Sequence, residues 1–238
     1  MRVTSRFALA ALAVFALSAC DDDPVSPAQS GRVRAVHAVA DVAGMDVLLN
    51  TATYKTNLAF KNTDGYRTTT VGATAIKFRK TGVATDLHAA NVAVANASDY
   101  TVISLGTEAA PQSVVLTDNN ASPAAGKVKL RAVHGAATGG ALDVYVLANA
   151  NELPAAAAVK TNLAAKGASD YIEKDAGAYV VIFTTAGTKT PVLTINVAQV
   201  AAGGGVGEVQ RLGRLRQAAE LGHLHEEFDL GPAIHVYP

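Results

Sequence analysis

Cysteine and tryptophan are the scarcest residues: the 238-residue chain has one cysteine and no tryptophan, and only 5% of it is aromatic. A single thiol excludes an intramolecular disulfide and any metal site built from several cysteines. The few aromatic residues disfavour a sugar-binding surface of stacked rings, although 7 tyrosines are present. The chain must therefore fold by packing apolar side chains, which its 50% hydrophobic content allows.

An excess of one charge is also absent, since 20 basic and 20 acidic residues give a formal net charge of zero. Removing an N-terminal segment that contains Arg2 and Arg6 would change this balance to 20 − 2 − 20, or −2. Binding to nucleic acid relies on a clustered basic face, so we expect no nucleic-acid partner. After the N-terminal segment, no apolar run approaches the roughly 20 residues of a membrane-spanning helix.

Residues 1–19 have the pattern of an export signal. Arg2 and Arg6 precede an uncharged apolar run over 7–17, which is too short to span a bilayer. The sequence Leu17-Ser18-Ala19-Cys20 that follows resembles the bacterial lipobox. This resemblance implies cleavage before Cys20 and lipidation at that residue, where two or more acyl chains would anchor the protein stably. The alternative is an ordinary secretory signal with an unmodified Cys20.

The residues after Cys20 begin Asp21-Asp22-Asp23-Pro24 and include further serine and proline. A run of this kind cannot bury apolar surface, and it is typical of a solvated tether, which we assign to 20–30. We therefore expect an exported protein that is anchored by lipid to a bacterial membrane and faces the periplasm or the cell exterior. The sequence leaves open which membrane holds it.

The rest of the chain contains an internal repeat. Arg34-Ala35-Val36-His37 recurs as Arg131-Ala132-Val133-His134, an offset of 131 − 34 = 97, and Asp46 recurs as Asp143 at the same offset. The segment 55–59 recurs at 160–164, an offset of 160 − 55 = 105. The second copy therefore carries 105 − 97 = 8 extra residues, which we place around Glu152-Leu153-Pro154.

A repeat period near 100 residues is a domain length. We therefore expect two domains, at 31–118 and 126–205, joined by a linker at 119–125. Apolar and polar residues alternate over 127–132, and β-branched or aromatic runs such as 179–184 end at glycine or asparagine. Many short strands at regular spacing predict an all-β chain of two tandem antiparallel β-sandwich domains, immunoglobulin-like in type.

Three short motifs in the second copy carry a resemblance to a known family. They are Arg-x-x-His at 131–134, Asp-Val-Tyr-Val at 143–146 and Ala-Gly-x-Tyr at 176–179. Repeated in tandem behind a lipobox, they resemble the bacterial family called domain of unknown function 4397, over about 31–200. The resemblance implies extracytoplasmic β-sandwich modules with no established activity, and it supplies no catalytic residue or cofactor.

The most suggestive polar pairs are His37 with Asp46 and His134 with Asp143. A histidine and an aspartate can act as a base and its orienting group, but neither copy has a serine in a Gly-x-Ser-x-Gly turn. Strand alternation directs both histidines toward the core, where a ring N–H would bind a neighbouring loop or carboxylate. Duplication favours this structural role, because an active site is usually needed only once. We therefore predict no catalytic residue.

Two other polar features have a structural and a functional interpretation. Arg34 and Arg131 could bind an acidic ligand, but we favour a solvent-facing position or an ion pair with a carboxylate of the domains. Asp41 and Asp46 could offer oxygen atoms to calcium, but Thr138 replaces Asp41 in the second copy. We therefore predict a solvated turn there, and no metal or cofactor.

The C-terminal residues depart from the repeat. The composition changes after Gly205, and 206–238 contains many charges and the polar cluster of His223, His225, Glu226 and Glu227. Apolar residues recur every three positions from Val206 to Leu215, which favours a helix. We therefore expect the second domain to lack its last strands and the tail to be helical or disordered. Three explanations stay open: a helix over the gap, a partner or second copy in the gap, or a frame shift in the gene.

Our leading hypothesis is a non-enzymatic lipoprotein that binds or scaffolds a protein or glycan in the cell envelope or at the surface. One alternative is an envelope hydrolase or metal-dependent enzyme, which would need a polar constellation outside the repeated positions. The sequence offers none except the cluster in the tail. The other alternative is a purely structural spacer.

Overall fold

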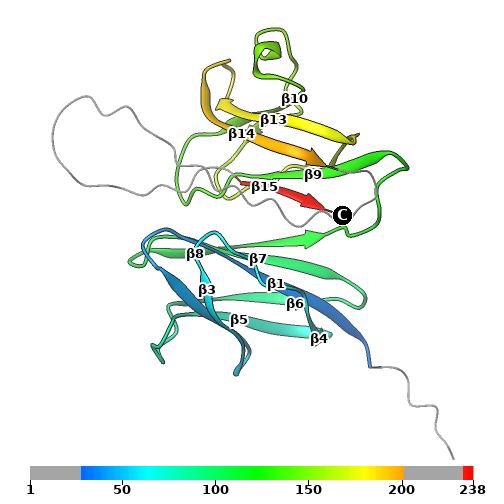
Figure 1. Ribbon diagram of the computed structural model, residues 1–238. Coiled ribbons are helices and arrows are strands. Elements are labelled where there is room, and N and C mark those ends of the chain that lie inside the picture. Colours follow the sequence, from blue (N-terminus) through cyan, green and yellow to red (C-terminus); the bar gives the residue numbers. More distant parts are fainter. Residues whose placement is uncertain (1–27, 201–232, 238) are drawn as a thin grey trace, which may run out of the picture.

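A computed structural model describes residues 28–200 and 233–237, and this part of the chain is all-β apart from one short 3-10 turn. The first repeat forms two four-stranded sheets, with strand orders β4-β1-β7-β8 and β3-β2-β5-β6 (Figure 1). Its strands are β1 (Ser30–Val39), β2 (Gly44–Leu49), β3 (Ala52–Ala59), β4 (Arg67–Thr70), β5 (Gly72–Lys80), β6 (His88–Val94), β7 (Asp99–Gly106) and β8 (Pro111–Asp118).

The second repeat has corresponding strands in the same order. Its sheets are β12-β9-β15 and β11-β10-β13-β14. The elements are β9 (Lys127–Val133), β10 (Leu142–Leu147), η1 (Ala150–Glu152), β11 (Lys160–Leu163), β12 (Ile172–Asp175), β13 (Gly177–Thr185), β14 (Pro191–Val200) and β15 (Ala233–Tyr237). The isolated bridge between Val36 and Thr63 recurs between Val133 and Ala168, at the two offsets found in the sequence.

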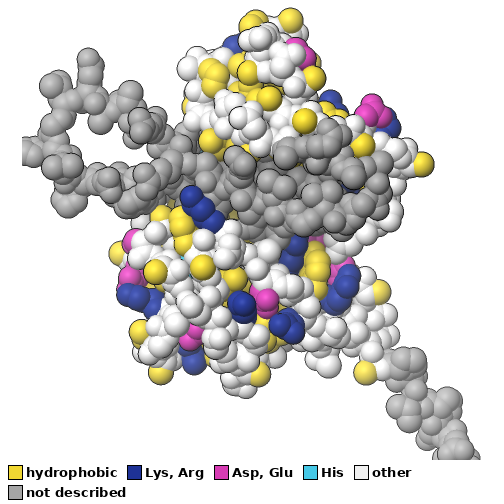
Figure 2. All heavy atoms as spheres, in the orientation of Figure 1, with side chains coloured by type: hydrophobic (Ala, Val, Ile, Leu, Met, Phe, Trp, Pro, Cys, Tyr) yellow, Lys and Arg dark blue, Asp and Glu magenta, His cyan; other side chains and the backbone are white. Residues whose placement is uncertain are grey.

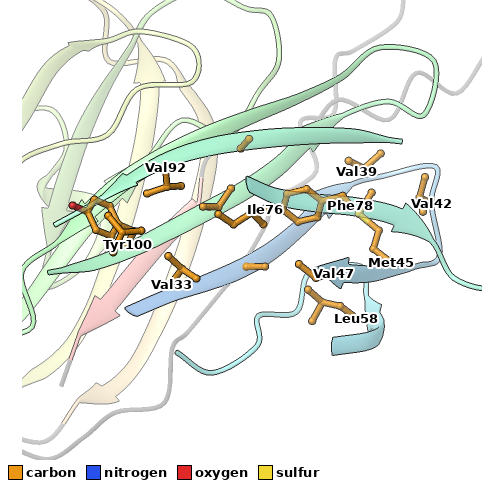
Figure 3. Packing of buried hydrophobic residues seen from close by; sticks show 14 residues of the cluster. Val33, Val39, Val42, Met45, Val47, Leu58, Ile76, Phe78, Val92 and Tyr100 are labelled. Carbon is orange, nitrogen blue, oxygen red and sulfur yellow. The ribbon is translucent and has the colours of Figure 1, made fainter. Parts of the chain in front are cut away.

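One core lies between the two sheets of the first repeat (Figure 3). Val33 and Tyr100 come from one sheet, while Val47 and Phe78 come from the other, and all four are buried in one cluster. The alternation of burial along β6 reflects this, since every second side chain points inward. An equivalent cluster in the second repeat joins residues of β9 with residues of β10, β13 and β14.

Strand β1 differs from the expected strand with one solvent-facing side, because it is buried on both faces beyond Arg34. Val33, Ala35 and Val39 contribute to the core between the sheets. Val36 and Ala38 point the other way and pack in a separate cluster that includes Val133 of the second repeat. Period-two alternation cannot reveal this, because the outer face is covered by a segment about 100 residues away in sequence.

The sheets are not purely antiparallel, so this part of the expectation is wrong. β1 and β7 pair in parallel, from Arg32 opposite Asp99 to Val39 opposite Gly106. Of the strands between them, β4 pairs antiparallel with β1 on its other side, while β2, β3, β5 and β6 form the other sheet, and the chain returns along β7 in the direction of β1. The order also differs from that of immunoglobulin constant domains, in which the first, second, fifth and fourth strands share a sheet.

The eight extra residues of the second repeat lie in the loop between β10 and β11, as the offsets predict. This loop contains η1, and Leu153 after it is buried against Tyr145, Leu147 and Ile182 on the outer face of the sheet. The corresponding face of the first repeat carries Lys77, which forms an ion pair with Asp86. The insertion therefore covers a sheet face on which the apolar Ile182 takes the position of the charged Lys77.

The tail requires a correction at its end. Residues 233–237 form strand β15, not a helix or a disordered segment, and β15 pairs antiparallel with β9. It occupies the place that β7 occupies beside β1 (Figure 1). Backbone pairing along the exposed edge of β9 provides the physical reason, because an unpaired strand edge accepts almost any extended segment. The predictions for 206–232, including the cluster from His223 to Glu227, lie outside the described residues.

Candidate functional site

His37 is fully buried on β1, and both nitrogen atoms of its ring form hydrogen bonds with backbone groups. Its Nε2 lies 2.8 Å from the carbonyl oxygen of Val42, and its Nδ1 accepts a hydrogen bond of 3.2 Å from the N–H of Val39. A carbonyl can only accept, so Nε2 carries the proton and the neutral ring satisfies both partners. Burial lowers the pKa of His37, and the bond to Val42 opposes this effect. The ring therefore holds the β1–β2 loop in place.

His134 takes the same role in the second repeat. Its Nε2 lies 3.1 Å from the carbonyl oxygen of Gly140, in the loop that leads to β10. The backbone carbonyl of each histidine also accepts a bond from a lysine N–H, at 2.9 Å from Lys61 to His37 and 2.8 Å from Lys166 to His134. Both lysines have left-handed backbone conformations, with φ of 68° and 63°. The histidines thus secure two loops in each repeat.

Asp46 and Asp143 bind other partners. Asp46 accepts bonds from the N–H of Asn57 at 2.9 Å and of Gly82 at 3.4 Å. Asp143 accepts the equivalent bonds from Asn162 at 2.9 Å and Gly187 at 2.8 Å. All four donors have positive φ, between 49° and 80°. Each carboxylate therefore holds a left-handed asparagine within a strand, β3 or β11, and a left-handed glycine in the turn after β5 or β13. This conformation costs energy for asparagine.

Sequence reasoning missed these donors, although a signal was present. Asn57 and Gly82 recur in the second copy at offset 105, as do the aspartates at offset 97. Asparagine and glycine are the residues that most readily adopt positive φ. Their repetition, together with a repeated aspartate, indicates that the aspartate stabilises the backbone through hydrogen bonds. It does not indicate a catalytic base with its orienting group.

Asp41 also binds backbone. Its two carboxylate oxygens accept bonds of 2.8 and 3.0 Å from the N–H of Glu108, between β7 and β8. Asp46 binds Asn57 in β3 and Gly82 after β5, so the two carboxylates hold separate parts of the repeat. Within the described residues, no three histidine, cysteine, aspartate or glutamate side chains gather closely enough to hold a metal ion.

The two repeated arginines meet at one carboxylate, that of Asp118 at the end of β8. Its side chain is 0% exposed, and the side chains of Arg34 and Arg131 are each 11% exposed. Arg131 Nη1 lies 3.3 Å from Oδ1, and Arg34 Nε lies 3.9 Å from Oδ2. Arg34 comes from the first repeat and Arg131 from the second. Asp118 therefore links the repeats through a buried ion-pair network.

Hydroxyl groups complete the bonding of Asp118. The phenol of Tyr66 donates to Oδ2 at 2.6 Å, and the hydroxyl of Thr101 donates to the same oxygen. Burial and the bond to Asp118 raise the pKa of Tyr66 well above its usual value, so this phenol stays protonated. Arg131 also donates to the carbonyl oxygen of Thr117 at 3.0 Å. We call Asp118, Arg34, Arg131, Tyr66 and Thr101 the junction cluster.

A tyrosine lies against a pair of cationic side chains in each repeat. The guanidinium carbons of Arg32 and Arg34 lie 5.0 and 4.8 Å from the ring centre of Tyr66. Lys129 Nζ and the guanidinium carbon of Arg131 lie 4.9 and 5.1 Å from the ring centre of Tyr171. These distances are typical of cation–π contacts. The two stacks occupy equivalent positions in the repeats, and both border Asp118.

An apolar cluster continues the junction beyond the polar groups. Val36, Ile103 and Leu116 of the first repeat are buried in one cluster with Val133, and Ala137 and Ala168 pack against it. At its margin, Lys166 Nζ donates to Gln112 Oε1 at 3.0 Å. In the linker, the N–H of Asn119 donates to the hydroxyl of Tyr171 at 3.0 Å. The repeats therefore share a packed interface in addition to the linker.

The carboxylates and histidines at the repeated positions bond to backbone N–H and C=O groups or belong to the junction cluster, so this arrangement positions loops. Lys and Arg side chains alternate with Asp and Glu on the face of the first repeat seen in Figure 2. Cys20 lies outside the described residues. Within those residues, no helix has the length and apolar character that would let it cross a membrane.

Comparison with family models identifies a match to the first repeat. The model of a family described as "Domain of unknown function (DUF4397)" matches residues 31–145. The match covers the first repeat and continues through Arg131 and His134 to Tyr145, so it includes the junction cluster. It ends before the motif at 176–179. No curated protein matches the chain. Residues 31–145 therefore match the family known as domain of unknown function 4397, the family that the repeated motifs resemble.

Proposed function

We propose that this protein is an exported lipoprotein, anchored to a bacterial membrane through lipid on Cys20. The observation that carries the proposal is the sequence Leu17-Ser18-Ala19-Cys20 directly after an uncharged apolar run. The acidic segment that follows would keep the folded part away from the membrane, facing the periplasm or the cell exterior. A lone cysteine at this position is difficult to explain by packing, because it precedes all described strands.

We further propose that the two repeats are tandem β-sandwich domains that bind or scaffold an envelope or surface partner without catalysis. Each repeat resembles an immunoglobulin domain in having two sheets around one core, but not in strand order. The structural bonds of His37, Asp46, His134 and Asp143 support the non-enzymatic interpretation, because a group that is bonded to the backbone is poorly placed to transfer protons.

The spacer interpretation is a second candidate, and the junction cluster is the observation that favours it. A buried ion-pair network and an apolar cluster would hold the two repeats at a constant angle. A rigid pair of domains on a flexible tether can present a distant surface or simply maintain distance from the membrane. The two candidates differ in whether a partner is bound.

The anchor can be tested by replacing Cys20 with serine in cells that are fed a labelled fatty acid. We expect the wild-type protein to incorporate label and to sediment with membranes. The Cys20→Ser variant should incorporate none and accumulate as uncut precursor. A matched control, Ser18→Ala, keeps a small residue before the cysteine and should behave as wild type. Membrane association and processing of Cys20→Ser would refute the proposal.

A further inference from the structure

The edge of β9 is occupied differently from the equivalent edge of β1. Each of these strands has an antiparallel neighbour on one side, β4 for β1 and β12 for β9. On the other side, β1 holds β7, while β9 holds the C-terminal strand β15 (Figure 1). The same strand position is thus occupied by β7 in the first repeat and by β15 in the second.

The two occupants differ in direction and in extent of pairing. β7 runs parallel to β1 and aligns eight residues with it, from Arg32 to Val39. β15 runs antiparallel to β9 and aligns five residues, from Lys129 to Val133. β7 is also paired on its far side with β8 over eight positions, whereas β15 is the last strand of its sheet among the described residues. β15 is therefore the less extensively held occupant.

The side chains of β9 match those of β1 at this position. Val33 and Ala35 of β1 face the core, and at offset 97 they correspond to Leu130 and Ala132, which are also buried. In the first repeat, this face packs with Tyr100 and Val102 of β7. The edge of β9 thus has the same inward side chains as the edge of β1, which holds a parallel strand with large apolar residues at alternate positions.

We propose that the edge of β9 now holding β15 is a strand-acceptor site for another polypeptide. The ligand would be an extended segment with alternating apolar residues, like those of β7, which displaces β15 and pairs in parallel with β9. Main-chain hydrogen bonds would supply affinity, and packing of the apolar side chains of the ligand beside Leu130 and Ala132 would supply specificity. This inference rests on the proposed binding function and deepens it by naming the chemistry of the partner.

The test uses the mature chain, residues 20–238, with Cys20→Ser so that the protein stays out of membranes. The probe is a fluorescent peptide of residues 99–118, the β7–β8 segment that pairs with β1 in the first repeat. Binding is measured by anisotropy on this protein and on a variant truncated after Pro232, which lacks β15. A control peptide carries Ile103→Pro, which removes one ladder N–H and disrupts a central strand.

We expect the truncated variant to bind the probe at least about tenfold more tightly than the complete mature chain, a difference of roughly 1.4 kcal/mol. The control peptide should bind neither. Hydrogen exchange should slow at the amides of 127–133 when the probe is added to the truncated variant. Slowing at β1 instead would show that the probe acts on the first repeat, and it would overturn the proposal.

Equal affinity of the two proteins, equal affinity of the two peptides, or no binding at all would also overturn it. If circular dichroism shows that the truncated variant has not folded, His235→Pro in the complete chain replaces it. His235 aligns with Arg131 in the β9–β15 ladder, so proline there weakens β15 without removing the tail. Because these proteins lack the lipid anchor, a negative result would count against strand binding at β9 only. Lipid attachment at Cys20 is tested separately by the labelling experiment.

Discussion

Replacing Asp118 with asparagine should show how much more the buried ion pairs of the junction cluster contribute to stability than a surface ion pair does. The substitution keeps the shape of the side chain but removes its charge. Arg34 and Arg131, each 11% exposed, would then face a neutral amide at a position that is 0% exposed. The amide NH₂ would also oppose one of the present donors, Tyr66, Thr101 or Arg131.

Removing one partner of a buried ion pair costs about 3–5 kcal/mol, because the remaining charge stays desolvated without compensation. For a chain of this size, 1 kcal/mol changes the melting temperature by about 2–4 °C. We therefore expect Asp118→Asn to lower the melting temperature by roughly 6–20 °C. Thermal unfolding followed by circular dichroism at neutral pH measures this directly.

Asp99→Asn is the matched control. Asp99 is bonded to Arg32 at 2.6 Å, and this bond lowers the pKa of Asp99, but the side chain of Arg32 is 49% exposed. The side chain of Asp99 is 12% exposed, but Arg32 stays in contact with water when the charge of Asp99 is removed. The loss should therefore be close to that of an exposed pair, about 0–1 kcal/mol, and this variant should unfold within a few degrees of wild type. If Asp118→Asn loses no more stability than Asp99→Asn, the junction cluster does not hold the repeats together as argued.

Three further predictions concern the histidines and the linker. His37→Gln and His134→Gln should each lower the free energy of unfolding by about 1–3 kcal/mol, since a buried backbone partner loses its bond; unchanged denaturant midpoints would contradict this. Burial lowers the pKa of His37 and brings that of His88 to about 4, so the unfolded chain binds protons first. Stability should be complete above about pH 6.5 and fall as the pH drops toward 4. His88→Leu, which copies Leu193 of the second repeat, should reduce this acid sensitivity, and an unchanged pH profile would refute the assignment. Limited proteolysis should cut within 119–125 and leave two fragments that co-elute in gel filtration, whereas fragments that separate would argue against the packed junction.

The internal repeat allowed much of the fold to be predicted from sequence alone. Strand alternation and β-branched runs indicate an all-β chain, because each strand must bury one face. The change of offset from 97 to 105 locates the insertion in the β10–β11 loop, since only a local insertion can shift all later matches equally. The inward direction of His37 and His134 follows from the same alternation.

The partners of the polar residues depended on tertiary structure. Arg34 and Arg131 are related by the repeat, yet both reach Asp118, which lies 84 positions after the first and 13 before the second. Nothing local to either arginine indicates this, because the contact requires the outer faces of two sheets to pack together. For the same reason, β1 looks half exposed in its sequence and is buried on both sides.

The parallel pairing of β1 with β7 and the position of β15 were also decided only in three dimensions. Alternation specifies which face of a strand is buried, but it contains no information about which strand lies alongside or in which direction. Backbone hydrogen bonds are the same for every sequence, so an open edge such as that of β9 can accept β15 despite its reversed direction. The sequence alone determined the export pattern, the repeat and the strand character, because these rest on local order. Pairing, register and the junction depend on segments that meet only after folding.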